Sequence, residues 1–109
     1  MSGSDGNGYS GGFESVDTCN SLFIETQLSS PKDDVVEAIN VGNILAVVTQ
    51  LVDATTVVVV LYQGKLAGGI AAPQVQMLRE CIAHGTLYDA VVVSKNDGQV
   101  RVRIKAKQR

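Results

Sequence analysis

The chain has 109 residues, of which 45% are apolar and 18% charged; this fits one globular domain and is too short for an elaborate cleft. It holds two Phe, three Tyr and no Trp, so its core must be mainly aliphatic. The net charge of −2 hides an asymmetry, because residues 1–54 carry eight acidic side chains and one basic one, and residues 55–109 carry three and eight. The asymmetry predicts a basic binding face, or an acidic arm that neutralises that face.

The cysteines and the ends of the chain bear on location. Cys19 and Cys81 are too few for a disulfide framework, and we expect Cys81 to be a free thiol buried on a helix face. No basic flank precedes an apolar block at the N-terminus, so no signal peptide is expected and the predicted location is cytoplasmic. The apolar window 44–62 is interrupted by polar residues, which favours two adjacent strands over a membrane span.

The first third of the chain changes character near residue 20. Residues 1–20 are predicted to be a disordered arm rich in Gly and Ser, and residues 21–107 to be the single globular domain. Residues 21–28 alternate between apolar and polar side chains with one charged face, which is typical of an edge strand.

A short helix is expected next. Ser30 would cap it, Pro31 would open it, and the acidic pair Asp33 and Asp34 would lie in its first turn, where the helix dipole favours negative charge. Residues 41–43 are equally compatible with the start of a strand.

The middle of the chain predicts three strands. Residues 44–52 and 56–62 flank a turn at 53–55, and residues 57–61 are apolar at both parities, as in a strand buried on both faces. Gln63 and Gly64 signal a tight turn before a short returning strand, 65–70. The pair Gly68 and Gly69 inside that strand predicts a bulge or a bend where the sheet curls.

A helix and a hairpin complete the chain. Residues 73–84 place Leu78 and Cys81 on an apolar helix face, with Gly85 just past the helix end. Residues 88–94 form a β-branched run, 95–98 have turn chemistry, and 100–107 alternate strictly.

The order of these elements predicts an α+β, β-rich fold. Three strands, a helix and two strands, with an extra N-terminal strand, describe either a small curled antiparallel sheet or an OB-like barrel (β-β-β-α-β-β), with one packed helix. The paired glycines suit a strand that bends sharply in either arrangement.

No catalytic or metal-binding set emerges from the sequence. Cys81 and His84 are three residues apart, but the thiol is expected to point into the core, so a structural cysteine is the preferred interpretation. Cys19 would supply at most a third metal ligand, whereas structural zinc takes four. We expect no catalytic residues, no metal and no cofactor.

A row of four cations is the strongest candidate site. Arg101, Arg103, Lys105 and Lys107 repeat at about 6.6 Å along one strand face, close to the phosphate repeat of an extended single strand. Three explanations fit this row: protection of an exposed sheet edge, contact with nucleic acid, or contact with an acidic protein. Aromatic candidates for base stacking are few, and the further candidate contacts are Tyr62, Tyr88, Lys65, Lys95 and Arg109.

These observations predict a small non-enzymatic accessory or interaction protein. The alternative is a nucleic-acid-binding barrel that uses the basic C-terminal strand, with Arg101, Arg103, Lys105, Lys107, Tyr88 and Lys65 as contacts. The expected partners are a second copy of the chain, since a Val-rich sheet hides an edge by pairing, and a single-stranded nucleic acid or an acidic protein. No membrane partner is expected.

Overall fold

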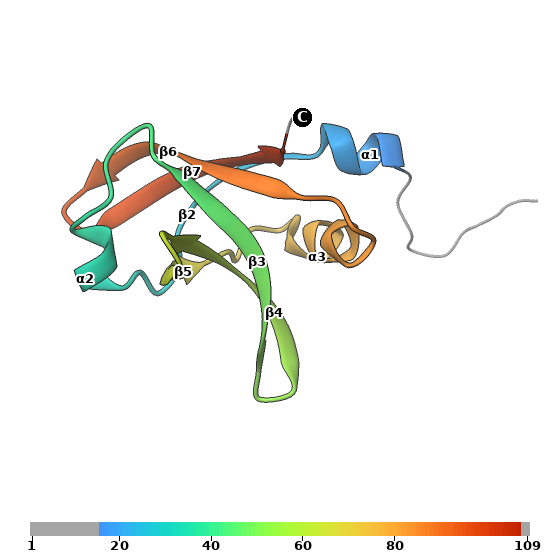
Figure 1. The fold of residues 1–109 in the computed structure, drawn as a ribbon, viewed down its shortest axis with the longest axis horizontal. Helices are drawn as coiled ribbons and strands as arrows, with labels where there is room; N and C mark the ends of the chain where they lie inside the picture. Colours follow the sequence, from blue (N-terminus) through green and yellow to red (C-terminus); the bar gives the residue numbers. More distant parts are fainter. Residues whose placement is uncertain (1–15, 108–109) are drawn as a thin grey trace, which may run out of the picture.

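A computed structural model describes residues 16–107 of the chain. Within this range the helices are α1 (Val16–Ser21), α2 (Asp33–Val36) and α3 (Val75–Ala83). The strands are β2 (Phe23–Gln27), β3 (Ile44–Val52), β4 (Thr55–Tyr62), β5 (Lys65–Gly69), β6 (Tyr88–Asn96) and β7 (Gln99–Ala106). The predicted strand order, with a helix before the last two strands, is confirmed, as is the α+β, strand-rich class (Figure 1).

All six strands join one antiparallel sheet in the order β2-β7-β6-β3-β4-β5. The sheet curls until its two ends meet at one bridge, where Ser29 and Gly69 exchange two backbone N–H···O hydrogen bonds of 2.8 Å. Lys32 N–H adds a bond to the carbonyl of Ala67. The sheet is not closed by a continuous ladder, so the structure matches the curled sheet of the two predicted arrangements.

The paired glycines lie where the ends of the sheet meet. A Cβ on Gly68 would lie 3.1 Å from the carbonyl oxygen of Ser29 and 3.2 Å from Cβ of Leu28. The pairing of β4 with β5 also shifts register next to Gly68. Close backbone approach and a register shift are the two reasons for Gly inside a strand, so the predicted bend is confirmed.

The core is aliphatic, as the composition predicts. Side chains that alternate along β2, β6 and β7 fill the inside of the curl, and α3 adds Leu78 and Cys81. The largest fully buried side chains are Ile24, Ile39, Leu45, Leu78 and Ile104.

The N-terminal helix is tied to α3 by a disulfide. Cys19 of α1 bonds to Cys81 of α3 across 62 positions of sequence, and the two Cα atoms lie 5.6 Å apart. The prediction that Cys81 is a free thiol is therefore wrong, although its buried position is confirmed. Residues 16–20, which we expected in the arm, form most of α1, so the folded part begins before residue 21; residues 1–15 lie outside the described range.

The other two helices match their predictions with shifted ends. In α2, Asp33 and Asp34 lie in the first turn as expected, but Lys32 rather than Ser30 is the N-cap residue, and it makes no side-chain capping bond. Helix α3 begins at Val75, two residues after Pro73, with Gln74 as its N-cap. Across residues 16–107, none of the helices is both long enough and apolar enough to cross a membrane.

The β3–β4 hairpin reaches beyond the body of the molecule (Figure 1). The β3–β6 ladder ends at Ala46 and the β4–β5 ladder ends at Val59, so residues 47–58 form a two-stranded projection that we call the hairpin arm. The predicted burial of 57–61 on both faces holds for Val58 to Val60, whereas Val57 and Leu61 are only partly buried. Leu51, on β3 near the tip of the arm, is 73% exposed.

Candidate binding site on the outer face of β7

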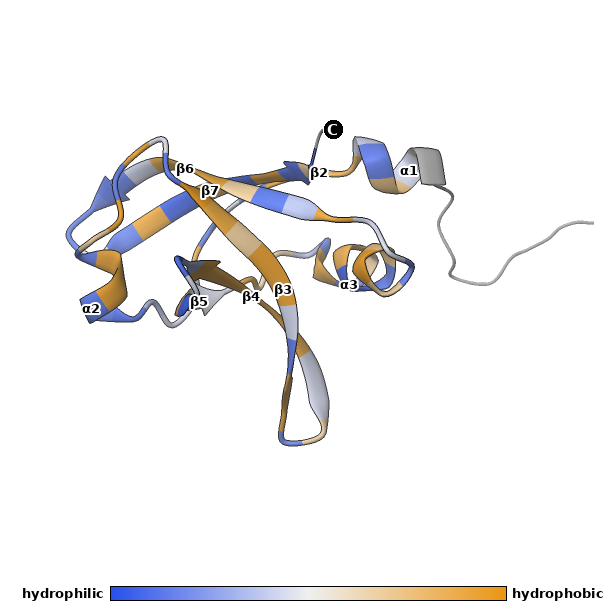
Figure 2. Ribbon diagram, in the orientation of Figure 1, coloured by the Kyte–Doolittle hydropathy of each residue, from blue (hydrophilic) through white to orange (hydrophobic). Residues whose placement is uncertain are grey.

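Strand β7 has the strict alternation that its sequence predicts. Val100, Val102, Ile104 and Ala106 are buried, whereas Arg101, Arg103, Lys105 and Lys107 are exposed, and we call these four cations the basic row. Figure 2 shows the resulting bands of hydrophilic and hydrophobic residues along β7. The row therefore lies on the outer, solvent-facing side of the curled sheet.

Strand β7 is an interior strand of the sheet. It pairs with β2 on one side, from Phe23 with Lys105 to Gln27 with Arg101, and with β6 on the other. The explanation of the basic row as protection of a sheet edge is therefore wrong, because β7 has no free edge over this length. Strand β2 is an edge strand of the sheet, as predicted.

One carboxylate pairs with both arginines of the basic row. Glu25 on β2 lies opposite Arg103 and accepts a hydrogen bond of 3.1 Å from Nε of Arg101 and one of 3.2 Å from Nη2 of Arg103. The bond from Arg101, followed by that from Arg103, lowers the pKa of Glu25 below its ordinary value. Both arginine side chains remain 46% exposed, so the pairs lie at the surface.

The lysine half of the row has an aromatic neighbour. Phe23 lies opposite Lys105 in the ladder, is 53% exposed, and has the guanidinium carbon of Arg103 5.7 Å from its ring centre. Asp89 of β6 lies opposite Lys105 on the other side. Among the described residues, Lys105 and Lys107 form no ion pair.

Phe23 and Glu25 are the site residues that sequence reasoning missed. Both lie on the polar face of the alternating strand 21–28, so their side of the sheet could be read from the sequence. Their position beside the basic row depends on the pairing of β2 with β7, which joins residues almost eighty positions apart.

The other predicted contacts lie elsewhere. Tyr88 is buried, and its hydroxyl donates a 2.6 Å hydrogen bond to the carbonyl of Cys19, while burial raises the pKa of that hydroxyl. Its ring therefore cannot stack on a ligand at the outer face. Lys65 begins β5, at the opposite end of the sheet order from β2 and β7. Tyr62, which is half-buried, ends β4, and Arg109 lies outside the described residues.

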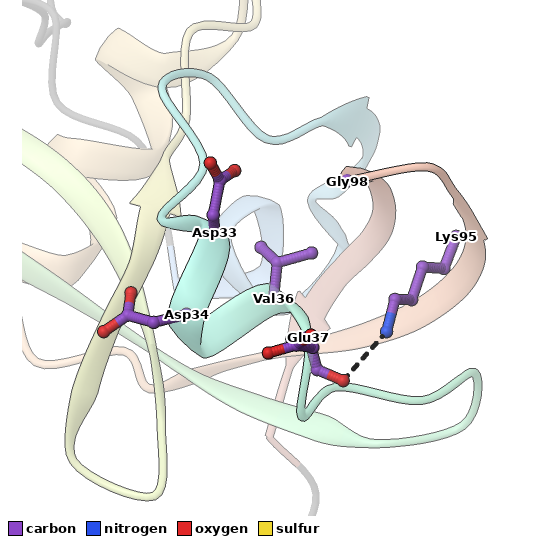
Figure 3. Close-up of a pocket in the computed structure, with 6 residues that line it drawn as sticks. All are labelled: Asp33, Asp34, Val36, Glu37, Lys95 and Gly98. Carbon is purple, nitrogen blue, oxygen red and sulfur yellow. Dashed lines mark hydrogen bonds between the residues drawn. The ribbon is translucent and has the colours of Figure 1, made fainter.

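Lys95 has a structural position at a separate hollow. Its Nζ donates bonds of 3.2 Å and 2.7 Å to the carbonyls of Glu37 and Ile39, which follow α2. Figure 3 shows Lys95 reaching the Glu37 carbonyl at the rim of a hollow of about 500 Å³ that Asp33 and Asp34 also line. Its ammonium group joins β6 to the loop after α2 and is not part of the basic row.

The two cysteines considered for catalysis and metal binding form a disulfide instead of being free thiols. With their sulfur atoms bonded to each other, Cys19 and Cys81 supply neither a thiolate nucleophile nor a thiolate ligand. In the described part of the chain, no three His, Cys, Asp or Glu side chains gather where they could hold a metal ion.

Comparison of the chain with protein-family models, with curated proteins and with solved structures finds no match. The fold defines it as a small α+β protein with one curled antiparallel sheet.

Proposed function

We propose that this chain is a non-enzymatic interaction protein that binds an anionic partner on the outer face of β2 and β7. The observation that carries the proposal is the pair Lys105, on the interior strand β7, and Lys107, just past its end, both exposed near the exposed ring of Phe23. A rigid strand holds the charges at a fixed spacing of about 6.6 Å, so a partner meets them without ordering a loop.

The anionic partner is either an acidic protein segment or a single-stranded nucleic acid, and the exposed ring of Phe23 favours the nucleic acid. An exposed aromatic ring between cations is the arrangement on which a base stacks while the lysines contact neighbouring phosphates. An acidic protein segment would use the same lysines but has no need of the ring. Replacement of Phe23 therefore separates the two partners.

The cytoplasmic location stays a prediction, and its main support has gone. It rested on a free Cys81 thiol and on the lack of a signal-peptide pattern, whereas Cys19 and Cys81 form a buried disulfide. Disulfides persist in oxidising compartments and are rare in the cytosol, so the bond favours a location outside a reducing compartment.

Binding at different salt concentrations tests the proposed function. The probes are a single-stranded oligonucleotide and a poly-glutamate peptide, with affinity measured by fluorescence anisotropy. If Lys105 and Lys107 each neutralise one phosphate, the log–log salt slope for the oligonucleotide is about −1.4. Lys105→Gln with Lys107→Gln should bring that slope close to zero, and Phe23→Ala should weaken oligonucleotide binding and leave peptide binding unchanged.

The matched control removes the same amount of positive charge from another part of the surface. Lys32→Gln with Lys65→Gln also removes two exposed lysines, one from the loop beside β5 and one from the start of β5. This control should keep the slope of the natural chain. An equal loss of affinity in both double variants, or the absence of binding to both probes at low salt, would refute the basic row as a binding surface.

A further inference from the structure

The two edges of the hairpin arm differ in their backbone partners. On the β4 side, the carbonyl of Thr56 accepts a 2.9 Å bond from Nη1 of Arg79, and the carbonyl of Val58 accepts one of 2.9 Å from the N–H of Ile70. On the β3 side, the ladder with β6 stops at Ala46, and no strand in residues 16–107 continues it along 47–52. The β3 side of the arm is therefore an open sheet edge.

The turn of the arm shows which groups face that edge. Asp53 and Ala54 form a two-residue turn with positive φ at both positions, and Val52 pairs with Thr55 across it. The residues that flank such a turn point their backbone groups at each other, and the direction alternates along the strand. Thr49 and Leu51 consequently direct their N–H and C=O groups away from β4, towards solvent.

This edge lacks the features that keep sheet edges apart. Its sequence from Val47 to Val52 is VVTQLV, with no charged residue and no proline. Natural edge strands carry charges, prolines or bulges because an unprotected edge pairs with another strand. A two-stranded ribbon has little stability by itself, so an uncharged, β-branched edge on this arm is suited to receive another strand.

We propose that the partner is the β3 edge of a second copy of this chain, paired antiparallel about a two-fold axis. Only alternate residues of the edge direct their backbone N–H and C=O groups outward. In an antiparallel pair an odd-numbered residue must therefore lie opposite an odd-numbered residue of the second copy, and an even-numbered one opposite an even-numbered one. Centring on Gln50 places Val48 opposite Val52, Thr49 opposite Leu51, and Gln50 opposite itself. The edge is complementary to itself in this register, because Val48 lies opposite Val52 at each end and the two Gln50 side-chain amides lie opposite each other at the centre.

The neighbouring strand selects the centre. If the pairing were centred on Thr49, Val52 would lie opposite Ala46 of the second copy, whose edge is already taken by Asp89. Centring on Gln50 shifts the second chain by two residues, so that Val52 lies opposite Val48 and the new ladder ends before β6 begins. The next register that satisfies parity on the other side, centred on Leu51, would place Thr49 opposite Asp53 of the turn.

A hollow beside the edge receives the most exposed apolar side chain. Leu51 of the second copy would lie opposite Thr49, on the face where Thr49 lines a hollow of about 340 Å³ together with Ile82 and Ala83 of α3. Leu51 is 73% exposed in the single chain. The pairing therefore buries two copies of Leu51 against α3 and extends the sheet through both molecules.

Sedimentation equilibrium of the full chain under non-reducing conditions tests the pairing. The natural chain should have the mass of two chains at high micromolar concentration, and Leu51→Lys the mass of one, because the charge must be buried at the α3 hollow. The control Thr55→Lys places the same charge on β4 at the tip of the arm and should stay dimeric. A natural chain that remains monomeric, or a Leu51→Lys variant that remains dimeric, overturns the proposal.

A cysteine at the two-fold axis tests the register. The two copies of Gln50 form a pair without hydrogen bonds, in which Cα atoms lie about 4.5 Å apart, within the range that a disulfide spans. Gln50→Cys should form a covalent dimer on mild oxidation, and Thr55→Cys, which lies one strand further from the axis, should not. Efficient cross-linking of Thr55→Cys with none of Gln50→Cys would exclude this pairing, and equal cross-linking of both would exclude the register.

Discussion

Glu25 determines how many cations of the basic row are available to a partner. Its carboxylate bridges Arg101 and Arg103, whereas Lys105 and Lys107 are left to solvent. Because the arginine bonds hold the pKa of Glu25 below its ordinary value, the bridge is intact above that ordinary value. It is lost only as pH falls through the lowered pKa, so at neutral pH Glu25 competes with any anionic ligand for the two arginines.

Removal of the Glu25 charge should therefore strengthen binding of a polyanion. Glu25→Gln frees Arg101 and Arg103, which raises the number of phosphate contacts from two to four and steepens the salt slope from about −1.4 to about −2.8. Anisotropy titrations of a single-stranded oligonucleotide at several salt concentrations measure this slope. Glu37→Gln, which removes an exposed carboxylate after α2, is the control and should leave the slope unchanged. An unchanged slope in Glu25→Gln would mean that the arginines do not contact the ligand.

Glu25→Gln should have little effect on folding. Ion pairs between exposed side chains contribute little to stability because water and salt screen them. The thermal midpoint of the variant should match that of the natural chain, which separates a change in binding from a change in folding.

At the scale of single elements, local pattern predicts the strands well. Two-residue turns flank β3, β4 and β7, and alternation places each side chain of β7 on the correct face. These signals lie within a few residues of one another, and the structure keeps them because each agrees with the burial of the apolar face. The α2 cap differs because Ser30 adopts a positive φ in the bend before the helix.

Contacts between distant segments could not be predicted from the sequence. The pairing of β2 with β7 makes β7 an interior strand and brings Glu25 and Phe23 to the basic row. The Cys19–Cys81 bond joins residues 62 positions apart. No local pattern encodes which strand or which cysteine is the neighbour, so the sequence predicts a row of four charges without the Glu25 carboxylate or the Phe23 ring beside it.

Helix α1 depends on its disulfide. Six residues are too few for a stable helix in water, and the contacts that hold α1 include the bond to Cys81 and the hydrogen bond from Tyr88 to Cys19. With 62 positions between the cysteines, loss of the bond should reduce the free energy of unfolding by about 4 kcal/mol through added chain entropy. Urea unfolding with and without reductant measures it.

A double variant serves as the control for reduction. Cys19→Ala with Cys81→Ala removes the link without leaving buried thiols, and reductant should not change its stability. Equal urea midpoints for the oxidised and reduced natural chain would show that the bond does not contribute to folding.

At the scale of the whole molecule, the curl of the sheet separates two surfaces. The basic row lies on the outer face of β7, and the open edge of the arm belongs to β3, with β6 between the two strands. Neither surface contributes a residue to the other. A substitution in the basic row should therefore leave self-association intact, and one at the arm edge should leave the charge of the row intact.

The curl itself depends on how closely the two ends of the sheet approach. At Gly68 the obstacles to a Cβ are the backbone carbonyl of Ser29 and Cβ of Leu28, at 3.1 and 3.2 Å, and neither can rotate away. At Gly69 the nearest atom is the Ser29 hydroxyl, at 3.2 Å, which can turn aside. The two neighbouring glycines can therefore be compared directly, since Gly68 approaches atoms that cannot move aside and Gly69 approaches a hydroxyl that can.

Alanine substitutions at these two positions measure how strongly the contact between β2 and β5 supports the fold. Gly68→Ala should lower the free energy of unfolding by about 1–2 kcal/mol, because the added methyl group forces Ser29 away from Gly69 and strains the bridge. Gly69→Ala should be nearly neutral, since the reduced entropy of the unfolded chain offsets a small displacement of the hydroxyl. Urea unfolding of both variants gives the comparison, and amide exchange at Ser29 and Gly69 should become faster in Gly68→Ala alone. Equal stabilities, with both amides still protected in Gly68→Ala, would show that the ends of the sheet can move apart without cost and that the curl is maintained by the core beneath it.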